Sequence, residues 1–266
     1  DICSLLQRQY AENAADIMAS FYNSNALCLR VNTLKTTVAA LNAQLKSEGA
    51  ETEVQGKALL VLNGADKALE AVNSGLAFVQ GLSSQEAVEA LDAKEGQTVI
   101  DVCACPGGKT LGAALDMGGK GRIISMDLHA NKLSLIEKSA AVLGVDIIET
   151  RAHDGRKPIS GFEELADRVI CDVPCSGIGA IKGRPEIRYK SLDTVDKLIE
   201  TQRAILSVAW GYLKKGGRLV YSTCTINKDE NEGVLVPFAE GAMARVVSMR
   251  TVLPTENNKD GFFIAV

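Results

Sequence analysis

The stretch that decides the fold is Thr98–Thr110, which reads TVIDVCACPGGKT. It joins an apolar run over Thr98–Val102, typical of a buried strand, to two adjacent glycines and a helical pattern over Thr110–Met117. Glycines between a strand and a helix let a ligand approach the backbone closely. The stretch is not a Walker A loop, because Cys103 stands where that loop has its first glycine. It predicts either a ligand-binding loop or an ordinary tight turn.

Strands and helices alternate beyond this stretch. The elements predicted there are strands at Arg122–Met126, Asp146–Glu149, Arg168–Cys171, Arg218–Tyr221 and Phe262–Val266, and helices at Lys132–Val142 and Leu192–Leu213. This alternation predicts an α/β fold with a mainly parallel, doubly wound sheet. Ligands of such sheets bind beyond the carboxyl ends of the strands. The polar residues that follow each strand are therefore the first candidates for a functional site.

The N-terminal part of the chain carries shorter, mixed elements. The patterns predict helices at Leu5–Phe21, Val38–Leu45 and Asp66–Val72, and strands at Leu27–Val31 and Leu59–Leu62. We therefore expect a small α+β domain over residues 1–75 and a larger domain over residues 76–266. Near the C-terminus, Pro237 predicts a break in any helix over Asn231–Val247.

Composition excludes several classes of protein. The chain has 266 residues, of which 46% are hydrophobic and 23% charged, and this argues against disorder. No apolar run approaches the roughly 20 residues of a membrane span, and no leader pattern opens the chain, so we expect a cytoplasmic protein without a membrane partner. Seven cysteines, an odd number, indicate free thiols in a reducing compartment. A net charge of −4 argues against indiscriminate polyanion binding but leaves room for a local basic groove.

Acidic residues follow the second and third strands of the larger domain. Asp127 comes 26 residues after Asp101, where a carboxylate can accept hydrogen bonds from both hydroxyls of a ribose. Asp154 follows the third strand, where it could meet an adenine amino group. A single acid at a strand end is more often a helix cap or a solvated charge. Together with the glycine loop, however, these acids outline a nucleoside-bearing cofactor lying across the sheet.

Cysteines follow the fourth and fifth strands. Residues 172–177 read DVPCSG and residues 222–225 read STCT, which places Cys175 and Cys224 at neighbouring strand ends. A lone cysteine is by default a small buried hydrophobe, and we expect this of Cys3, Cys28, Cys103 and Cys171. The cysteine spacings miss the usual Cys-x-x-Cys pairing of metal sites and histidine is scarce, so no metal site is expected.

Three motifs together, at residues 103–110, 172–177 and 222–225, resemble the signatures of RNA cytosine-5 methyltransferases that use S-adenosylmethionine. Residues 29–33, 177–189 and 260–265 are similar to the bacterial RsmB-type enzymes that act on 16S ribosomal RNA. The resemblance implies a Rossmann-like methyltransferase sheet behind a small N-terminal α+β domain of RNA-binding type. Such enzymes usually carry a further NusB-like domain, so we expect this chain to be a fragment or a shortened form. They also usually have alanine where Cys105 stands.

The resemblance also implies roles for individual residues. Cys224 would add to C6 of a cytosine in RNA, Cys175 would assist product release, and Asp172 would lie near the cofactor and the target base. Chemistry alone leaves the order of the two cysteines open, because DNA cytosine methyltransferases carry the nucleophile in their Pro-Cys motif. The residues implied to bind S-adenosylmethionine are Cys103, Ala104, Cys105, Pro106, Gly107, Gly108, Lys109, Asp127, Asp154 and Asp172.

A basic segment follows the Cys175 motif. It contains Lys182, Arg184, Arg188 and Lys190 against one acid, Glu186, which gives a local charge of +3. With Arg30 from the small domain, these residues are the candidates for RNA phosphate contacts, although scattered basic residues are usually solvated surface charges. The target base must also be unstacked to expose C5 and C6.

Three other functions compete with methylation of 16S ribosomal RNA. One is methylation of another target, such as tRNA, another RNA or a protein. Another is a non-catalytic RNA-binding subunit that retains the fold, which the presence of both Cys175 and Cys224 disfavours. The third, a redox or metal dithiol protein, would rest on Cys103 and Cys105 alone.

Overall fold

The computed structural model describes all of residues 1–266 and divides them into two compact units. One unit is formed by residues 26–154, and the other by residues 1–25 together with residues 155–266. No helix in the structure is long and apolar enough to cross a membrane.

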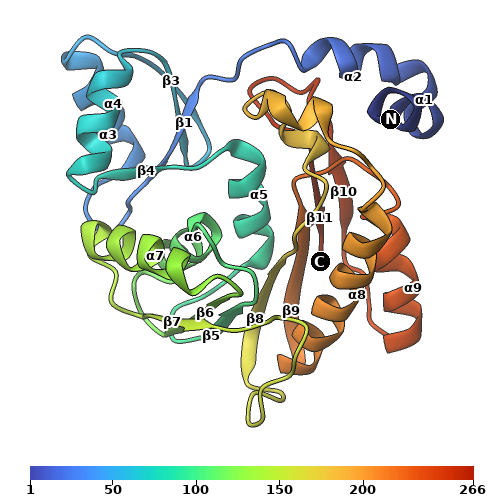
Figure 1. The fold of residues 1–266 in the computed structure, drawn as a ribbon. Coiled ribbons are helices and arrows are strands. Elements are labelled where there is room, and N and C mark those ends of the chain that lie inside the picture. Colours follow the sequence, from blue (N-terminus) through green and yellow to red (C-terminus); the bar gives the residue numbers. More distant parts are fainter. The chain divides into compact units, whose positions relative to one another are not determined.

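The unit of residues 26–154 begins with a four-stranded antiparallel sheet. Its strands, in the order β2-β3-β1-β4, are β2 (Glu51–Gln55), β3 (Ala58–Asn63), β1 (Leu27–Val31) and β4 (Ala77–Val79). Helices α3 (Val38–Ser47) and α4 (Ala65–Asn73) lie against the sheet (Figure 1). Leu29, Leu41 and Leu59 are fully buried between these layers. Apolar residues shared by strand and helix therefore form the core that the α+β pattern predicts.

The same unit continues with three parallel strands. They are β5 (Thr98–Asp101), β6 (Arg122–Asp127) and β7 (Ile148–Ala152), which pair in the order β5-β6-β7. Helices α5 (Leu82–Leu91), α6 (Gly108–Asp116) and α7 (Ala130–Leu143) accompany them. The register places Asp127 opposite Ala152, so β6 and β7 end at the same edge. Residues that follow these strands therefore gather at one edge, as expected for parallel strands.

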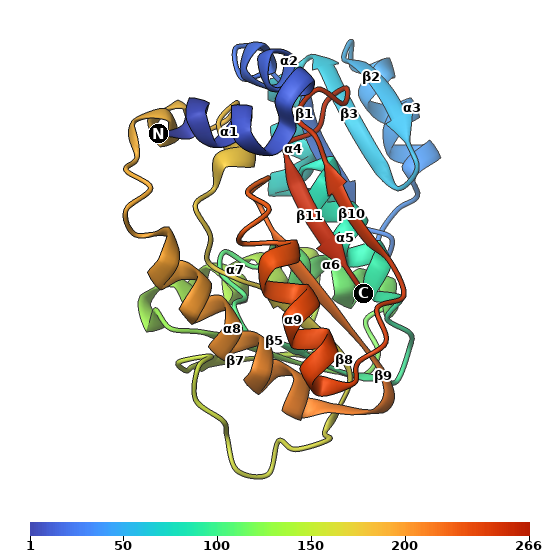
Figure 2. The same cartoon turned by 90° about the vertical axis from the view of Figure 1, so that its right-hand side faces the viewer.

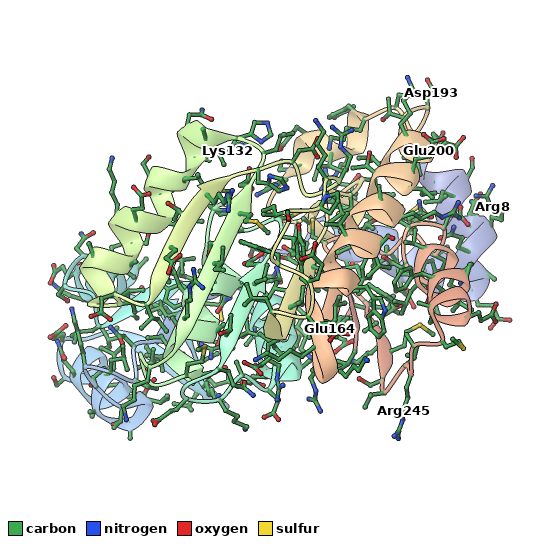
Figure 3. All side chains as sticks on the ribbon, turned by 90° about the horizontal axis from the view of Figure 1, so that it is seen from below. Arg8, Lys132, Glu164, Asp193, Glu200 and Arg245 are labelled. Carbon is green, nitrogen blue, oxygen red and sulfur yellow. The ribbon has the colours of Figure 1, made fainter.

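The other unit contains β8 (Ala166–Asp172) and β9 (Leu213–Thr223), which run parallel, and β11 (Phe262–Ala265) and β10 (Met249–Val252), which pair antiparallel. Within this unit the strands follow one another in the order β10-β11-β9-β8. Helices α8 (Val195–Tyr212) and α9 (Glu232–Ala242) lie side by side (Figure 2). Around α8, the exposed Asp193 and Glu200 point outward (Figure 3), whereas Leu206 is fully buried.

The single helix predicted over Leu5–Phe21 was wrong. The chain instead forms α1 (Ile2–Tyr10), a short 3₁₀ turn and α2 (Ala14–Ser20), with a break at Ala11, where φ is +42°. The break has a packing reason. Residues of α1 and residues at the end of α2 contact the same apolar cluster. On one straight helix, residues 12 positions apart would lie about 18 Å apart, so the break brings them closer to a common cluster. The cluster consists of Ile2, Leu5, Leu6, Ala14, Ile17, Phe21, Ile178, Ile181, Ile187 and Ile226.

The predicted break at Pro237 was also wrong, because α9 runs through this residue. A proline inside a helix has no N–H for the carbonyl four residues earlier, which here belongs to Gly233. The Arg203 guanidinium of α8 donates to that carbonyl at 3.3 Å. A tertiary contact thus replaces the missing helical hydrogen bond.

Two glycines bring separate backbone segments together beside Cys224. The Gly179 N–H donates to the Cys224 carbonyl at 3.1 Å, and the Gly261 N–H donates to the Gly179 carbonyl at 2.9 Å. A Cβ atom at Gly179 would lie 1.9 Å from the Gly261 carbonyl oxygen. Only glycine fits position 179 without movement of the backbone.

Gly179→Ala should therefore lower the free energy of unfolding by about 1–3 kcal/mol, the usual cost of overpacking. Thermal unfolding followed by calorimetry measures this as a lower Tm. Gly183→Ala is the matched control, because nothing lies within 4 Å of a Cβ atom there. Equal melting temperatures for the two variants would contradict the close approach at Gly179.

Candidate active site

The two cysteines at the strand ends meet in the structure. Cys175 follows β8 and Cys224 follows β9, and the parallel register places Asp172 opposite Ser222. The two sulfurs lie 3.4 Å apart, within hydrogen-bonding reach for a thiol and a thiolate. Both side chains are half-buried. The motifs at residues 172–177 and 222–225 therefore form one dithiol site.

The Cys175 thiol holds its proton strongly. Its hydrogen bond with Cys224 is the largest cause that raises its pKa well above the usual range, followed by burial. The negative charges of Cys224, Glu230 and Asp172 add to the effect. Two neighbouring sulfurs cannot both ionise easily, so the pair favours one thiol and one thiolate.

Asp172 lies at the carboxyl end of β8, beside this pair. Its carboxylate accepts a hydrogen bond from the Ser222 hydroxyl at 2.6 Å. The side chain is half-buried, and the backbone N–H of Val173 donates to the Ser222 carbonyl at 3.1 Å. These contacts tie the start of the Cys175 loop to the end of β9.

A buried polar cluster that sequence reasoning missed lies behind the two cysteines. Glu230 is fully buried, and its oxygens accept hydrogen bonds from Ser176, Gln202 and Asn227. The Ser176 and Thr225 hydroxyls lie 2.8 Å apart. In the sequence Glu230 stands in the polar run KDENE at residues 228–232, which is typical of a solvated surface segment. Nothing in the local pattern marks this carboxylate as buried.

The predicted cofactor loop lies in the unit of residues 26–154. Gly107, with φ of +113°, precedes α6, and no side chain caps the start of that helix. A Cβ atom at Gly107 would lie 2.9 Å from Ile136, so the loop needs glycine there. The Ala104 N–H donates to the Met126 carbonyl at 2.8 Å, which fixes this part of the loop to β6. The uncapped N–H groups of α6 suit a carboxylate ligand.

Asp127 lies at the end of β6 and contacts this loop. Its carboxylate accepts hydrogen bonds from the Cys105 N–H at 3.1 Å and the His129 N–H at 2.9 Å. Burial, followed by the charge of Asp127, raises the pKa of the Cys105 thiol to about 11. The half-buried Asp154 follows β7, and the His153 N–H donates to the Asp127 carbonyl at 2.9 Å. A ribose needs acceptors of this kind, so the residues present fit a nucleoside-bearing cofactor.

The predicted RNA-binding residues differ in how exposed their side chains are and in the partners that they contact. Arg30 is 1% exposed and forms an ion pair with Asp116 at 2.7 Å, so it offers no surface to a phosphate. Lys182 donates to the Asn25 side chain at 3.2 Å, and burial lowers the pKa of its ammonium group. Its role in this structure is to hold the segment after α2.

The other three basic residues follow the Cys175 loop. Arg188 donates to the Phe21 carbonyl at 2.7 Å and stacks over the Tyr22 ring at 4.3 Å. Lys190 reaches the Ser176 carbonyl at 3.5 Å. Arg184 is exposed. Arg184 and Lys190 are thus the members of the set with exposed side chains, and RNA binding by them stays a prediction.

Two models of known protein families match this chain. Residues 88–266 match the family model described as 16S rRNA methyltransferase RsmB/F. Residues 2–65 match a model described as an RsmF/B-like methyltransferase, ferredoxin-like domain. The chain belongs to the RsmB/F family. The division into domains at residue 75 stays a prediction.

Curated relatives agree with the RsmB/F assignment. The chain is 40% identical over 217 residues to a probable ribosomal RNA small subunit methyltransferase B of Bacillus subtilis (strain 168), covering 80% of this chain and 48% of the relative. It is 32% identical over 289 residues to a protein of the same description from Synechocystis sp., covering 99% of this chain and 65% of the relative. The chain thus spans about half to two thirds of the length of these relatives.

Solved structures share the fold of this RsmB/F chain. A methyltransferase homologue from Pyrococcus horikoshii superposes with a TM-score of 0.86 at 25% identity, over 98% of this chain and 92% of the other. NSun6 from the same organism, solved with the S-adenosylmethionine analogue SFG, has a TM-score of 0.89 at 23% identity, over 100% and 96% of the two chains. The predicted Rossmann-like methyltransferase fold is confirmed, and the family supports S-adenosylmethionine as the cofactor.

The cysteines of this RsmB/F chain should differ widely in reactivity. Burial raises the pKa of Cys28 to about 12, and that of Cys105 is about 11. A thiol with a pKa about three units above the pH is ionised in roughly one molecule in a thousand. At pH 8 iodoacetamide should therefore modify the exposed Cys3 long before Cys28 or Cys105. Mass spectrometry of peptides after timed labelling measures the order, and labelling of Cys105 as fast as Cys3 would contradict it.

Proposed function

We propose that the chain transfers a methyl group from S-adenosylmethionine to C5 of a cytosine in RNA, and that this RNA is 16S ribosomal RNA. The observation that carries the proposal is the Cys175–Cys224 pair, with sulfurs 3.4 Å apart at neighbouring strand ends. Membership of the RsmB/F family supports the reaction. Relatives named as ribosomal RNA small subunit methyltransferases support the choice of RNA.

The chemistry of cytosine explains why a nucleophilic sulfur is needed. C5 is a poor nucleophile until a group adds to C6. The Cys224 thiolate forms a bond to C6, and the electron pair of the C5=C6 double bond moves to C5, which takes the methyl group. Bound S-adenosylmethionine supplies that electrophilic methyl group. A base then removes the C5 proton, the electrons of the C–H bond restore the double bond, and the Cys224 thiolate leaves.

The proton held by Cys175 supports this division of labour. A Cys175 thiol that donates to the Cys224 sulfur stabilises Cys224 as the thiolate, the form that attacks. When Cys224 bonds to C6, it loses its negative charge, and the main cause that holds the proton on Cys175 is gone. Cys175 can then release its proton to water and accept the C5 proton of the methylated base. Asp172, on the same edge, is proposed to bond the cytosine N3–N4 edge.

Cys224→Ala should abolish methylation, because no nucleophile remains to add to C6. Cys175→Ala should still form the bond between Cys224 and C6 but release it slowly, so a protein–RNA adduct should survive denaturant. The measurements are 5-methylcytosine in a 16S RNA transcript and a denaturing gel of labelled RNA with each variant. An adduct with Cys224→Ala in place of Cys175→Ala would reverse the two roles. Methylation of tRNA but not of 16S RNA would keep the reaction and replace the substrate.

We further propose that residues 103–109 wrap the methionine and ribose of the cofactor, that Asp127 binds the ribose hydroxyls and that Asp154 meets the adenine. The uncapped start of α6 and the carboxylate at the end of β6 support this placement. The Asp127 side chain is 13% exposed, so its oxygens can still be reached by a ligand.

Asp127→Asn should weaken S-adenosylmethionine binding by about 10- to 100-fold, because a hydrogen bond to a charged group contributes about 1.5–3 kcal/mol. Isothermal titration calorimetry of the purified chain measures the change in Kd. Asp146→Asn is the control, since this exposed carboxylate precedes β7 at a distance from the loop in sequence. Equal Kd values for both variants would remove Asp127 from the proposed cofactor site.

A further inference from the structure

The buried Glu230 carboxylate takes no direct part in the steps above, yet it is fully satisfied. The Ser176 backbone N–H donates to it at 2.8 Å, the Gln202 amide at 3.0 Å and the Asn227 amide at 3.1 Å. The Ser176 hydroxyl is the fourth donor. All four hydrogen bonds come from neutral donors, and no arginine or lysine is among these partners.

The hydroxyl groups around Glu230 form a chain with a single direction. The Asn227 backbone N–H can only donate, and it donates to the Thr225 hydroxyl oxygen at 3.2 Å. Ser176 gives its only hydroxyl proton to the Glu230 carboxylate, so the Thr225 hydroxyl, 2.8 Å away, donates its proton to the Ser176 oxygen. A backbone donor at one end and a carboxylate at the other thus orient both hydroxyls.

The two hydroxyls belong to the residues that directly follow the cysteines. Ser176 follows Cys175, and Thr225 follows Cys224. Gln202 extends the support, because its amide also donates to the Pro174 carbonyl at 3.0 Å, on the other side of Cys175. Glu230 therefore holds the Cys175 backbone from both sides and joins it to the Cys224 loop.

We propose that Glu230 is a positioning residue for the dithiol: through Ser176 and Thr225 it fixes the Cys175 sulfur against Cys224, so that its loss stalls the reaction when the methylated RNA must be released. The inference rests on the proposed function, which assigns that release to Cys175. Glu230 acts through Ser176 and does not touch the reacting atoms.

The charge of Glu230 gives the proposal a readout that a purely structural role would leave unchanged. The ionisable groups that face Cys175 are Cys224, Glu230, Asp172 and Tyr221. Lys190 lies nearby, 3.5 Å from the Ser176 carbonyl. Because Glu230 is one of the charges that raise the Cys175 pKa, its removal should let Cys175 ionise at lower pH.

The first test uses Glu230→Gln, which keeps the volume but presents an NH₂ group to donors. We expect kcat to fall by about 10- to 100-fold, as misplacement of a reacting group by about 1 Å can cost, with KM for S-adenosylmethionine unchanged. A denaturant-stable RNA adduct should accumulate, as with Cys175→Ala. The control is Asp229→Asn, the exposed neighbouring carboxylate, which should behave as the unchanged chain. A loss of methylation without an adduct would overturn the inference.

A second readout needs no RNA. Iodoacetamide labelling of Cys175 across a pH series should begin at lower pH in Glu230→Gln than in Asp229→Asn, and coincident profiles would overturn the inference. If Cys175→Ala gives no adduct, the assigned release step fails, and the labelling profile alone decides the role of Glu230. Should Glu230→Gln fail to fold, Ser176→Ala carries the adduct test, in which the RNA adduct should again accumulate and its absence would overturn the inference. This variant removes the link between the loops but leaves Glu230 three donors.

Discussion

The approach of two sulfurs to 3.4 Å is the constraint on which the rest of the site depends. Parallel pairing of β8 and β9 brings their carboxyl ends together, and the register of Asp172 with Ser222 sets how far each loop must reach. A thiolate repels a second thiolate, so the pair is stable with one proton between the sulfurs. The geometry thus demands two loops whose backbones cannot drift apart, and it demands control over which sulfur carries the proton.

Two kinds of contact keep the backbones of the two cysteine loops close together. Beside the Cys175 loop, Ile178, Ile181 and Ile187 enter an apolar cluster with α1 and α2, and Ile226, which follows the Cys224 loop, joins it. The N-terminal helices therefore pack against residues that follow both cysteines. Behind the loops, a buried polar cluster joins Ser176 to Thr225, and the Glu230 carboxylate in it accepts four hydrogen bonds. Such a cluster specifies one arrangement more strictly than apolar packing, because a shift would leave the buried carboxylate without partners.

The sequence predicted those parts of the structure whose cause is local. Apolar runs located β5, β6 and β8, and the motifs after the strands identified Cys175 and Cys224, since parallel strands gather their ends whatever the details of packing. It failed where a distant partner decides. Arg203 donates to the carbonyl that Pro237 leaves without a helical partner. Arg30 is buried in an ion pair with Asp116. The weakly apolar β2 owes its place to pairing with β3. No local pattern records such partners.

The partners of Glu230 bear on which of the two sulfurs carries the proton. A carboxylate paired with arginine or lysine would hold the loops equally well, but the cation would cancel its field. The partners of Glu230 are neutral donors alone, and Glu230 is one of the groups that raise the pKa of Cys175, the residue before Ser176. A proton on Cys175 is then favoured, and the S–H group that remains can stabilise a negative charge on Cys224. Since the same hydrogen bonds set position and field together, the geometry of the dithiol and the protonation of Cys175 are not independent properties of this fold.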